Sequence, residues 1–208
     1  MISILNYRMG NLASIQNMFK KVGASNKTIS TPAEVNEAQA LVIPGVGKFD
    51  NAVRQLEAMG LLDTLNEAAH SRKIPILGIC LGMQLMTRSS EEGQLRGLGW
   101  IEGDTRLIDG SSQGLRVPHM GWNLVSIKKP NPFFDESIKE HRFYFVHSYA
   151  VQCDDSCDVL TTTDYAGTFV SSFSRGNLVG VQFHPEKSHK FGASFFRHFA
   201  DAYGLIDS

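Results

Sequence analysis

The sequence predicts an α/β protein with a doubly wound, mostly parallel sheet, helices on both faces, and an added antiparallel β-rich portion in its second half. Up to about residue 90, short aliphatic runs of strand length alternate with stretches whose apolar residues recur at helical spacing. This alternation is typical of parallel sheets, because parallel strands need a crossover between them. After that point, short strand-like runs separated by polar or Gly/Pro turns indicate antiparallel or mixed pairing. No repeat or linker interrupts the chain, so we expect one domain over 1–208.

Local signals support the elements of the first half. Asn11 can cap a helix that stops at Gly23. Thr31 to Glu34 forms a capping box with proline at the first helical position. In chain order, we expect a strand over 1–6, a helix over 12–22, a strand over 27–30, a helix from 32, a strand over 40–43, helices over 49–59 and 61–71, and a strand and helix over 74–86.

The second half is expected to contain mainly strands. The predicted strands cover 105–108, 122–127, 143–151, 159–163, 168–173 and 178–183, and they are separated by turn residues. A final helix over 191–203 places Phe195, Phe199 and Tyr203 on one stripe.

Composition excludes several classes of function. Lys and Arg number 20 against 21 Asp and Glu, so the chain lacks the basic excess expected of proteins that bind nucleic acid or anionic membranes. It has no signal-peptide pattern and no membrane-spanning run, so we expect a cytoplasmic protein in which Cys80, Cys153 and Cys157 are reduced thiols. No Walker loop, dinucleotide fingerprint or metal-ligand spacing occurs, so we expect neither a cofactor nor a metal.

The stretch from Ile74 to Leu85 has the pattern of a nucleophile elbow. A strand passes through Gly78-Ile79-Cys80-Leu81-Gly82 into a helix, which is the strand–turn–helix context of such an elbow with cysteine in place of serine. The flanking glycines allow a sharp turn without a Cβ clash, and the following helix N-terminus favours a thiolate. The alternative is a small buried cysteine on a core strand.

A possible base and its orienting carboxylate occur near the end of the chain. An apolar strand delivers His184 at its tip, Pro185 ends the strand, and Glu186 follows. Together with Cys80 these residues have the form of a Cys-His-acid triad, although a histidine before proline can also be a structural turn. Donors for an oxyanion could come from the N–H of Leu81 and from the loop at Val46 and Gly47, which could equally be an ordinary turn.

These residues carry a family resemblance. Three segments resemble the signatures of the class I, triad-type glutamine amidotransferases, whose fold is flavodoxin-like: Pro44–Gly47, Gly78–Gln84 and Gln182–Glu186. Within that family, three further segments are similar to the glutaminase subunits of imidazole glycerol phosphate synthases: Pro118–Asn123, Tyr144–Tyr149 and His184–Ser188.

The resemblance implies that Cys80 attacks the side-chain amide of L-glutamine, which yields glutamate and ammonia through a thioester. The implied glutamine-binding residues are Gly47, Gln84, Glu92, His147, Ser148 and Tyr149. Alternatively, Glu91 and Glu92 could form a solvated acidic loop and Tyr149 could belong to the core.

The resemblance also implies a partner. Ammonia would pass to a cyclase subunit, a (β/α)8 barrel, in a heterodimer of histidine biosynthesis. The implied interface residues are Asn11, Pro118, Met120, Trp122 and Lys187. Trp122 fits an interface anchor or a core position equally well.

Two departures from the family pattern leave the ammonia acceptor open. Arg8 stands where the family usually has glycine, and Lys48-Phe49-Asp50 replaces a commoner small or glycine-containing segment. Similar subunits supply sugar amidotransferases of surface-polysaccharide pathways, which is the alternative acceptor. The intact triad argues against a non-catalytic regulatory module. Gln84 and the Tyr149 region fit an enzyme acting on free glutamine better than a peptidase on the same fold.

Overall fold

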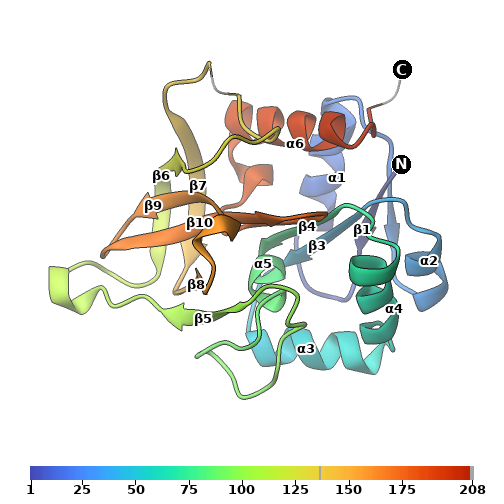
Figure 1. Ribbon diagram of the computed structural model, residues 1–208, viewed down its shortest axis with the longest axis horizontal. Coiled ribbons are helices and arrows are strands. Elements are labelled where there is room, and N and C mark those ends of the chain that lie inside the picture. Colours follow the sequence, from blue (N-terminus) through green and yellow to red (C-terminus); the bar gives the residue numbers. More distant parts are fainter. Residues whose placement is uncertain (136, 207–208) are drawn as a thin grey trace.

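The computed structural model describes residues 1–135 and 137–206, apart from the side chain of Ser112. In this part, eleven strands form one sheet, with helices on both of its faces (Figure 1). The strands are β1 (Ile2–Leu5), β2 (Asn26–Ile29), β3 (Leu41–Gly45), β4 (Ile76–Cys80), β5 (Gly103–Leu107), β6 (His119–Ile127), β7 (His141–His147), β8 (Tyr149–Cys153), β9 (Val159–Asp164), β10 (Thr168–Arg175) and β11 (Leu178–Val181). The α-helices are α1 (Leu12–Lys21), α2 (Pro32–Glu37), α3 (Phe49–Ala58), α4 (Leu62–Asn66), α5 (Leu81–Leu85) and α6 (His189–Ala202).

The sheet has a parallel part and an antiparallel part, as predicted. The strand order is β2-β1-β3-β4-β11-β10-β9-β6-β7, with β8 pairing β10 and β5. The first five strands in this order are parallel neighbours, and the remaining pairs are antiparallel. An order of the type 2-1-3-4-5 is that of flavodoxin-like sheets, which bind ligands beyond the carboxyl ends of the strands.

Two hydrophobic cores lie on opposite faces of the sheet. Helices α1 and α6 cover one face, and α3, α4 and α5 cover the other (Figure 1). Successive strand residues alternate between the cores: Val42 packs with α1 and α6, whereas Leu41 and Ile43 pack with α3 and α4. No helix in the described residues is both long enough and apolar enough to cross a membrane.

Most predicted elements occur with ends displaced by a few residues, but the predicted strand over 143–151 is two strands. The chain breaks at Ser148, because His147 pairs with His119 in β6 whereas Tyr149 pairs with Leu107 in β5. Such a change of partner depends on contacts between residues far apart in the sequence, which local patterns do not encode.

The structure also differs from the predicted helix over 61–71. Its second half is a π-helix, Glu67–Ser71, closed by a bond from Arg72 N to Glu67 O. The Arg72 guanidinium donates to the carbonyl oxygens of Val35, Asn36 and Ala38. This docking onto the end of α2 is a long-range contact, which periodicity does not encode.

One departure from the family pattern has a cost in backbone strain. Arg8 has φ of 67°, in the left-handed region where a side chain strains the backbone and glycine does not. The family's usual glycine therefore suits this position better than the arginine present here.

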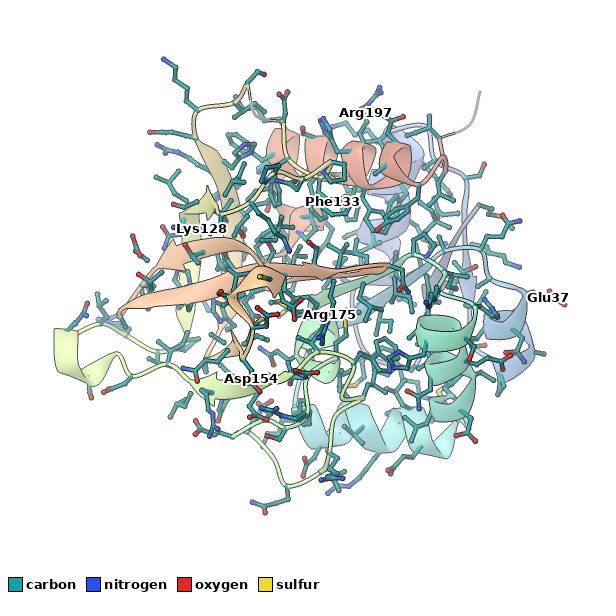
Figure 2. The ribbon with its side chains drawn as sticks, viewed as in Figure 1. Glu37, Lys128, Phe133, Asp154, Arg175 and Arg197 are labelled. Atoms are coloured by element: carbon teal, nitrogen blue, oxygen red, sulfur yellow. The ribbon has the colours of Figure 1, made fainter. Side chains whose placement is uncertain are left out.

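We expect Arg8→Gly to raise the free energy of unfolding by about 1 kcal/mol, because glycine removes the left-handed strain. The matched control is Arg197→Gly on α6, where an exposed arginine lies in regular helix (Figure 2). That change should lower the free energy of unfolding by about 1 kcal/mol. Urea unfolding of both variants measures the two signs, and a loss of stability in Arg8→Gly would contradict the account of this loop.

Candidate active site

The candidate site lies at the carboxyl ends of three neighbouring parallel strands, β3, β4 and β11. Gly45 of β3 pairs with Cys80 of β4, and Ile79 of β4 pairs with Val181 of β11. The residues that follow β11 therefore reach the level of Cys80. This register brings segments separated by about a hundred residues of sequence to one edge of the sheet.

The backbone at Cys80 turns sharply, as expected of an elbow. Cys80 has φ of 54° and ψ of −109°, which is unusual for a residue with a side chain. A Cβ on Gly82 would overlap the carbonyl oxygen of Ile43, and a Cβ on Gly78 would lie 2.7 Å from the carbonyl oxygen of Gly82. The flanking glycines thus permit close packing of β3, β4 and α5, which holds Cys80 in its strained conformation.

The turn after β11 places a carboxylate directly against an imidazole. His184 Nδ1 lies 2.7 Å from Glu186 Oε1, and both side chains are buried. A 3-10 turn over Pro185–Lys187 makes this contact possible between residues two apart. Ser188 braces the turn because its hydroxyl donates to His184 O at 2.6 Å.

The other nitrogen of His184 is available for chemistry. Nε2 is buried, and the contact with Glu186 uses the opposite nitrogen, Nδ1. Burial lowers the pKa of His184, but the charge and hydrogen bonding of Cys80 and Glu186 outweigh burial and raise this pKa to about 10. The structure therefore brings Cys80, His184 and Glu186 together with the imidazole between the sulfur and the carboxylate.

A cavity of about 310 Å³ opens beside Cys80. Its walls contain all six residues expected to bind glutamine. The lining residues are Val46, Gly47, Cys80, Leu81, Gln84, Glu92, Pro118, Val146, His147, Ser148, Tyr149 and His184. The three residues expected to form an oxyanion hole also lie here, and Tyr149 lines the cavity, so the alternative of a purely core position for Tyr149 is wrong.

Each acidic residue of the Glu91-Glu92 pair has a fixed partner. Glu92 Oε2 accepts from Phe49 N at 2.9 Å, at the first turn of α3. Glu91 instead accepts from Leu107 N at 2.8 Å and from Arg106 at 3.0 Å. The alternative of a merely solvated loop is therefore wrong for Glu92, whose carboxylate is held at the cavity wall.

Two buried histidines support the cavity wall, and one of them had no role in the sequence analysis. His147 Nε2 lies 3.0 Å from His119 Nδ1, and His147 Nδ1 lies 2.8 Å from the Tyr149 carbonyl oxygen. Burial lowers the pKa of His147 to about 3 and that of His119 to about 4, so both rings are neutral near pH 7. Only the pairing of β6 with β7 brings the two rings together.

Gln182 is a second residue without a role in the sequence analysis. Its Nε2 lies 3.6 Å from Cys80 Sγ. A signal existed in the sequence, since Gln182 precedes His184 by two residues and side chains two apart on an extended segment share a face. The sequence alone does not show that Gln182 lies beside Cys80, because that contact depends on the pairing of β4 with β11.

The expected interface residues lie on the surface. Met120 and Trp122 on β6 are 62% and 48% exposed, so the core alternative for Trp122 is wrong. Trp122 stacks on the His189 ring, with centroids 5.6 Å apart. Lys187 is exposed, with Nζ 5.9 Å from the Tyr144 ring centroid.

The remaining expected residues have local roles. Asn11 is exposed, and its side chain accepts from Ser14 N at the start of α1. Pro118 lines the cavity and is exposed. Cys153 is half-buried and Cys157 is exposed, and both are free thiols as expected.

Comparisons with known proteins identify the family. The chain matches the model of glutamine amidotransferase class-I over residues 3–202. It is 47% identical to the imidazole glycerol phosphate synthase subunit HisH 2 of Methanococcus maripaludis, over 96% of this chain and 98% of the relative. Subunit HisH of Leptospira interrogans is 42% identical, with 96% of this chain and 99% of the relative covered.

Solved structures have the same fold at low identity. A glutamine amidotransferase crystal structure superposes with a TM-score of 0.76 at 16% identity, covering 98% of this chain and 99% of the other. PurLQS from Thermotoga maritima gives a TM-score of 0.72 at 16% identity, with 97% of each chain covered. The family match over most of the sequence, the curated relatives above 40% identity and the shared fold agree with one another. The chain therefore belongs to the class I glutamine amidotransferase family.

Proposed function

We propose that this protein is the glutaminase subunit of an imidazole glycerol phosphate synthase in the cytoplasm, hydrolysing L-glutamine to glutamate and ammonia for histidine biosynthesis. The observation that carries the proposal is the meeting of Cys80, His184 and Glu186 beside a cavity lined by the expected glutamine-binding residues. The names of the curated relatives support the pathway.

In the proposed mechanism, His184 takes the proton of the Cys80 thiol, and the sulfur attacks the side-chain amide carbon of glutamine while the carbonyl electrons move to oxygen. The imidazolium of His184, held by Glu186, then protonates the departing nitrogen. Ammonia leaves when the C–N bond breaks, and a glutamyl thioester remains. His184 next removes a proton from water, which attacks the thioester carbon, and the C–S bond breaks to release glutamate.

Backbone donors at the cavity suit the oxyanion formed in both steps. Leu81 N lies at the start of α5, directly after the nucleophile. The second donor is proposed to come from the loop at Val46 and Gly47, where Gly47 has φ of 108°, a conformation that residues with a side chain rarely adopt. Tyr7 braces this loop, because its hydroxyl donates to Pro44 O at 2.6 Å.

The cavity has groups suited to a free amino acid. Glu92 supplies a carboxylate for the substrate ammonium, and donors near Ser148 suit the substrate carboxylate. Gln84 uses its Nε2 to donate to Tyr149 O and Gln182 Oε1, which leaves its own oxygen for an N–H of the substrate.

The proposed partner is a cyclase subunit of (β/α)8-barrel type that receives the ammonia in a heterodimer. Met120 and Trp122 form an exposed apolar area on β6, and Lys187 adds a positive charge. Exposed aromatic residues of this kind are typical anchors of protein interfaces. Val46 and Pro118 are exposed and also line the cavity, so this surface adjoins the place where ammonia forms.

Replacing Cys80 tests the mechanism. Cys80→Ala should lower glutamine-dependent product formation by roughly four orders of magnitude or more, because the nucleophile is lost. Synthesis from added ammonia by the partner subunit should survive. Cys157→Ser, at an exposed thiol outside the cavity, is the control and should retain activity. Glutamine use by Cys80→Ala would exclude the proposed mechanism.

The raised pKa of His184 predicts a pH dependence of stability. The folded protein favours the imidazolium more than the unfolded chain does, so this protonation stabilises the fold fully below about pH 6.5. The contribution is lost as pH rises toward about 10. The difference in free energy of unfolding between wild type and His184→Gln should therefore shrink across this window in urea titrations. A difference that grows with pH would contradict the raised pKa.

Trp122→Ala should weaken binding of the cyclase subunit roughly tenfold or more, because an exposed aromatic anchor is removed. Leu107→Ala is the control, since Leu107 is 54% exposed on β5 and lies outside the proposed interface. Isothermal titration with the purified cyclase subunit measures both. Equal affinity in the two variants would show that Trp122 is not part of the interface. If the protein bound a sugar amidotransferase and not the cyclase subunit, the proposed ammonia acceptor would change.

A further inference from the structure

The nucleophile has a second polar neighbour besides the histidine. Gln182 is fully buried, and its Nε2 lies 3.6 Å from Cys80 Sγ. Its Oε1 accepts from Gln84 Nε2 at 3.0 Å. Gln182 is not among the residues that line the cavity, so it approaches the sulfur from within the protein.

The hydrogen-bond partners determine which end of the Gln182 amide faces the sulfur. Gln84 lies 3.1 Å from the carbonyl oxygen of Tyr149, and a carbonyl oxygen can only accept, so the Gln84 atom there is Nε2. The same Nε2 faces Gln182, whose atom at that contact must then be its oxygen. The amide nitrogen of Gln182 therefore points at the sulfur, and rotating the amide would break this set of bonds.

The Tyr149 carbonyl that sets this orientation is itself held from the other side. It accepts from His147 Nδ1 at 2.8 Å, so His147 Nε2 in the neutral ring must accept from His119 Nδ1. His119 Nε2 then accepts from Asn123 Nδ2 at 3.2 Å. Donation thus runs from Asn123 through His119 and His147 to the Tyr149 carbonyl oxygen, which also accepts from Gln84 on its other side. From Gln84, donation continues through Gln182 to the nucleophile, and one arrangement of hydrogens satisfies every link.

We propose that Gln182 is a catalytic residue that donates a hydrogen bond to the Cys80 thiolate, with Gln84 as the residue that positions it. The inference deepens the proposed function and rests on Cys80 as the nucleophile of that reaction. A primary amide suits the task because it donates to a negative sulfur without exchanging a proton at neutral pH. His184 moves the proton, while Gln182 stabilises the charge left on sulfur and fixes the direction of the side chain.

Gln182→Met tests the donor, because methionine keeps the length of the side chain and removes the N–H. The measurement is the rate at which iodoacetamide alkylates Cys80 at pH 7, followed by mass spectrometry of the Cys80 peptide. We expect a fall of roughly tenfold, since hydrogen bonds to charged groups are among the stronger ones. Gln182→Glu should lower the rate further, because it places a carboxylate against the sulfur.

Two controls keep the measurement specific. Cys157 is exposed in the same molecule, so its alkylation rate is an internal reference that should stay constant. Gln152→Met makes the same chemical change at an exposed position on β8 and should leave the Cys80 rate unchanged. An unchanged Cys80 rate in Gln182→Met, relative to Cys157, would overturn the inference.

A second variant covers the case in which Gln182→Met does not fold. Gln84→Met leaves Gln182 in place but frees its amide to rotate, so the Cys80 rate should fall by less than in a variant without the donor. Alkylation at the wild-type rate in Gln84→Met would overturn the positioning role.

The alkylation assay needs no glutamine, so its outcome is separable from that of the proposed function. If Cys80→Ala abolishes glutamine use while Gln182→Met reacts like wild type, the function stands and this inference fails. If Gln182→Met slows alkylation, its kcat with glutamine should fall by a similar factor while KM changes little, because Gln182 lies outside the cavity lining. A change confined to KM would contradict the catalytic role.

Discussion

The close packing of β3, β4 and α5 is the constraint on which the candidate site depends. Gly82 lies against the Ile43 carbonyl, and Gly78 lies against Gly82, so no side chain fits between these backbones. Only this approach holds Cys80 in a left-handed conformation that a non-glycine residue rarely adopts. The strained residue is the same one that carries the nucleophilic sulfur, and the turn places it at the wall of the cavity although it is largely buried.

Around this elbow, the pKa values of two buried histidines are shifted in opposite directions by their surroundings. His184 lies between a carboxylate and the cysteine, and these outweigh burial, so its pKa rises. His147 has a carbonyl oxygen on one nitrogen and a neutral ring on the other, so burial dominates and its pKa falls to about 3. Neighbouring buried rings are thereby divided into one suited to proton transfer and one suited to holding the wall.

The sequence predicted what is encoded locally and missed what depends on pairing. The elbow at Cys80 and the turn that joins His184 to Glu186 each lie within a few residues, so their geometry follows from glycine, proline and strand signals. The break at Ser148 and the contact of His119 with His147 arise because β7 pairs with β6 whereas β8 pairs with β5. Gln182 lies in a recognised motif, but its role required the register of β4 against β11.

A chain of hydrogen bonds connects the proposed partner surface to the chemistry. Asn123 and His119 lie on β6, the strand that exposes Met120 and Trp122, and their hydrogen bonds continue through His147 to the Tyr149 carbonyl. That carbonyl also orients Gln84, and through it the amide at the sulfur. A partner bound on β6 can alter turnover only by favouring one arrangement of these groups over another. Because these groups are joined by specific hydrogen bonds, a shift of β6 would change the contact at Cys80 through broken or reformed bonds rather than through gradual deformation.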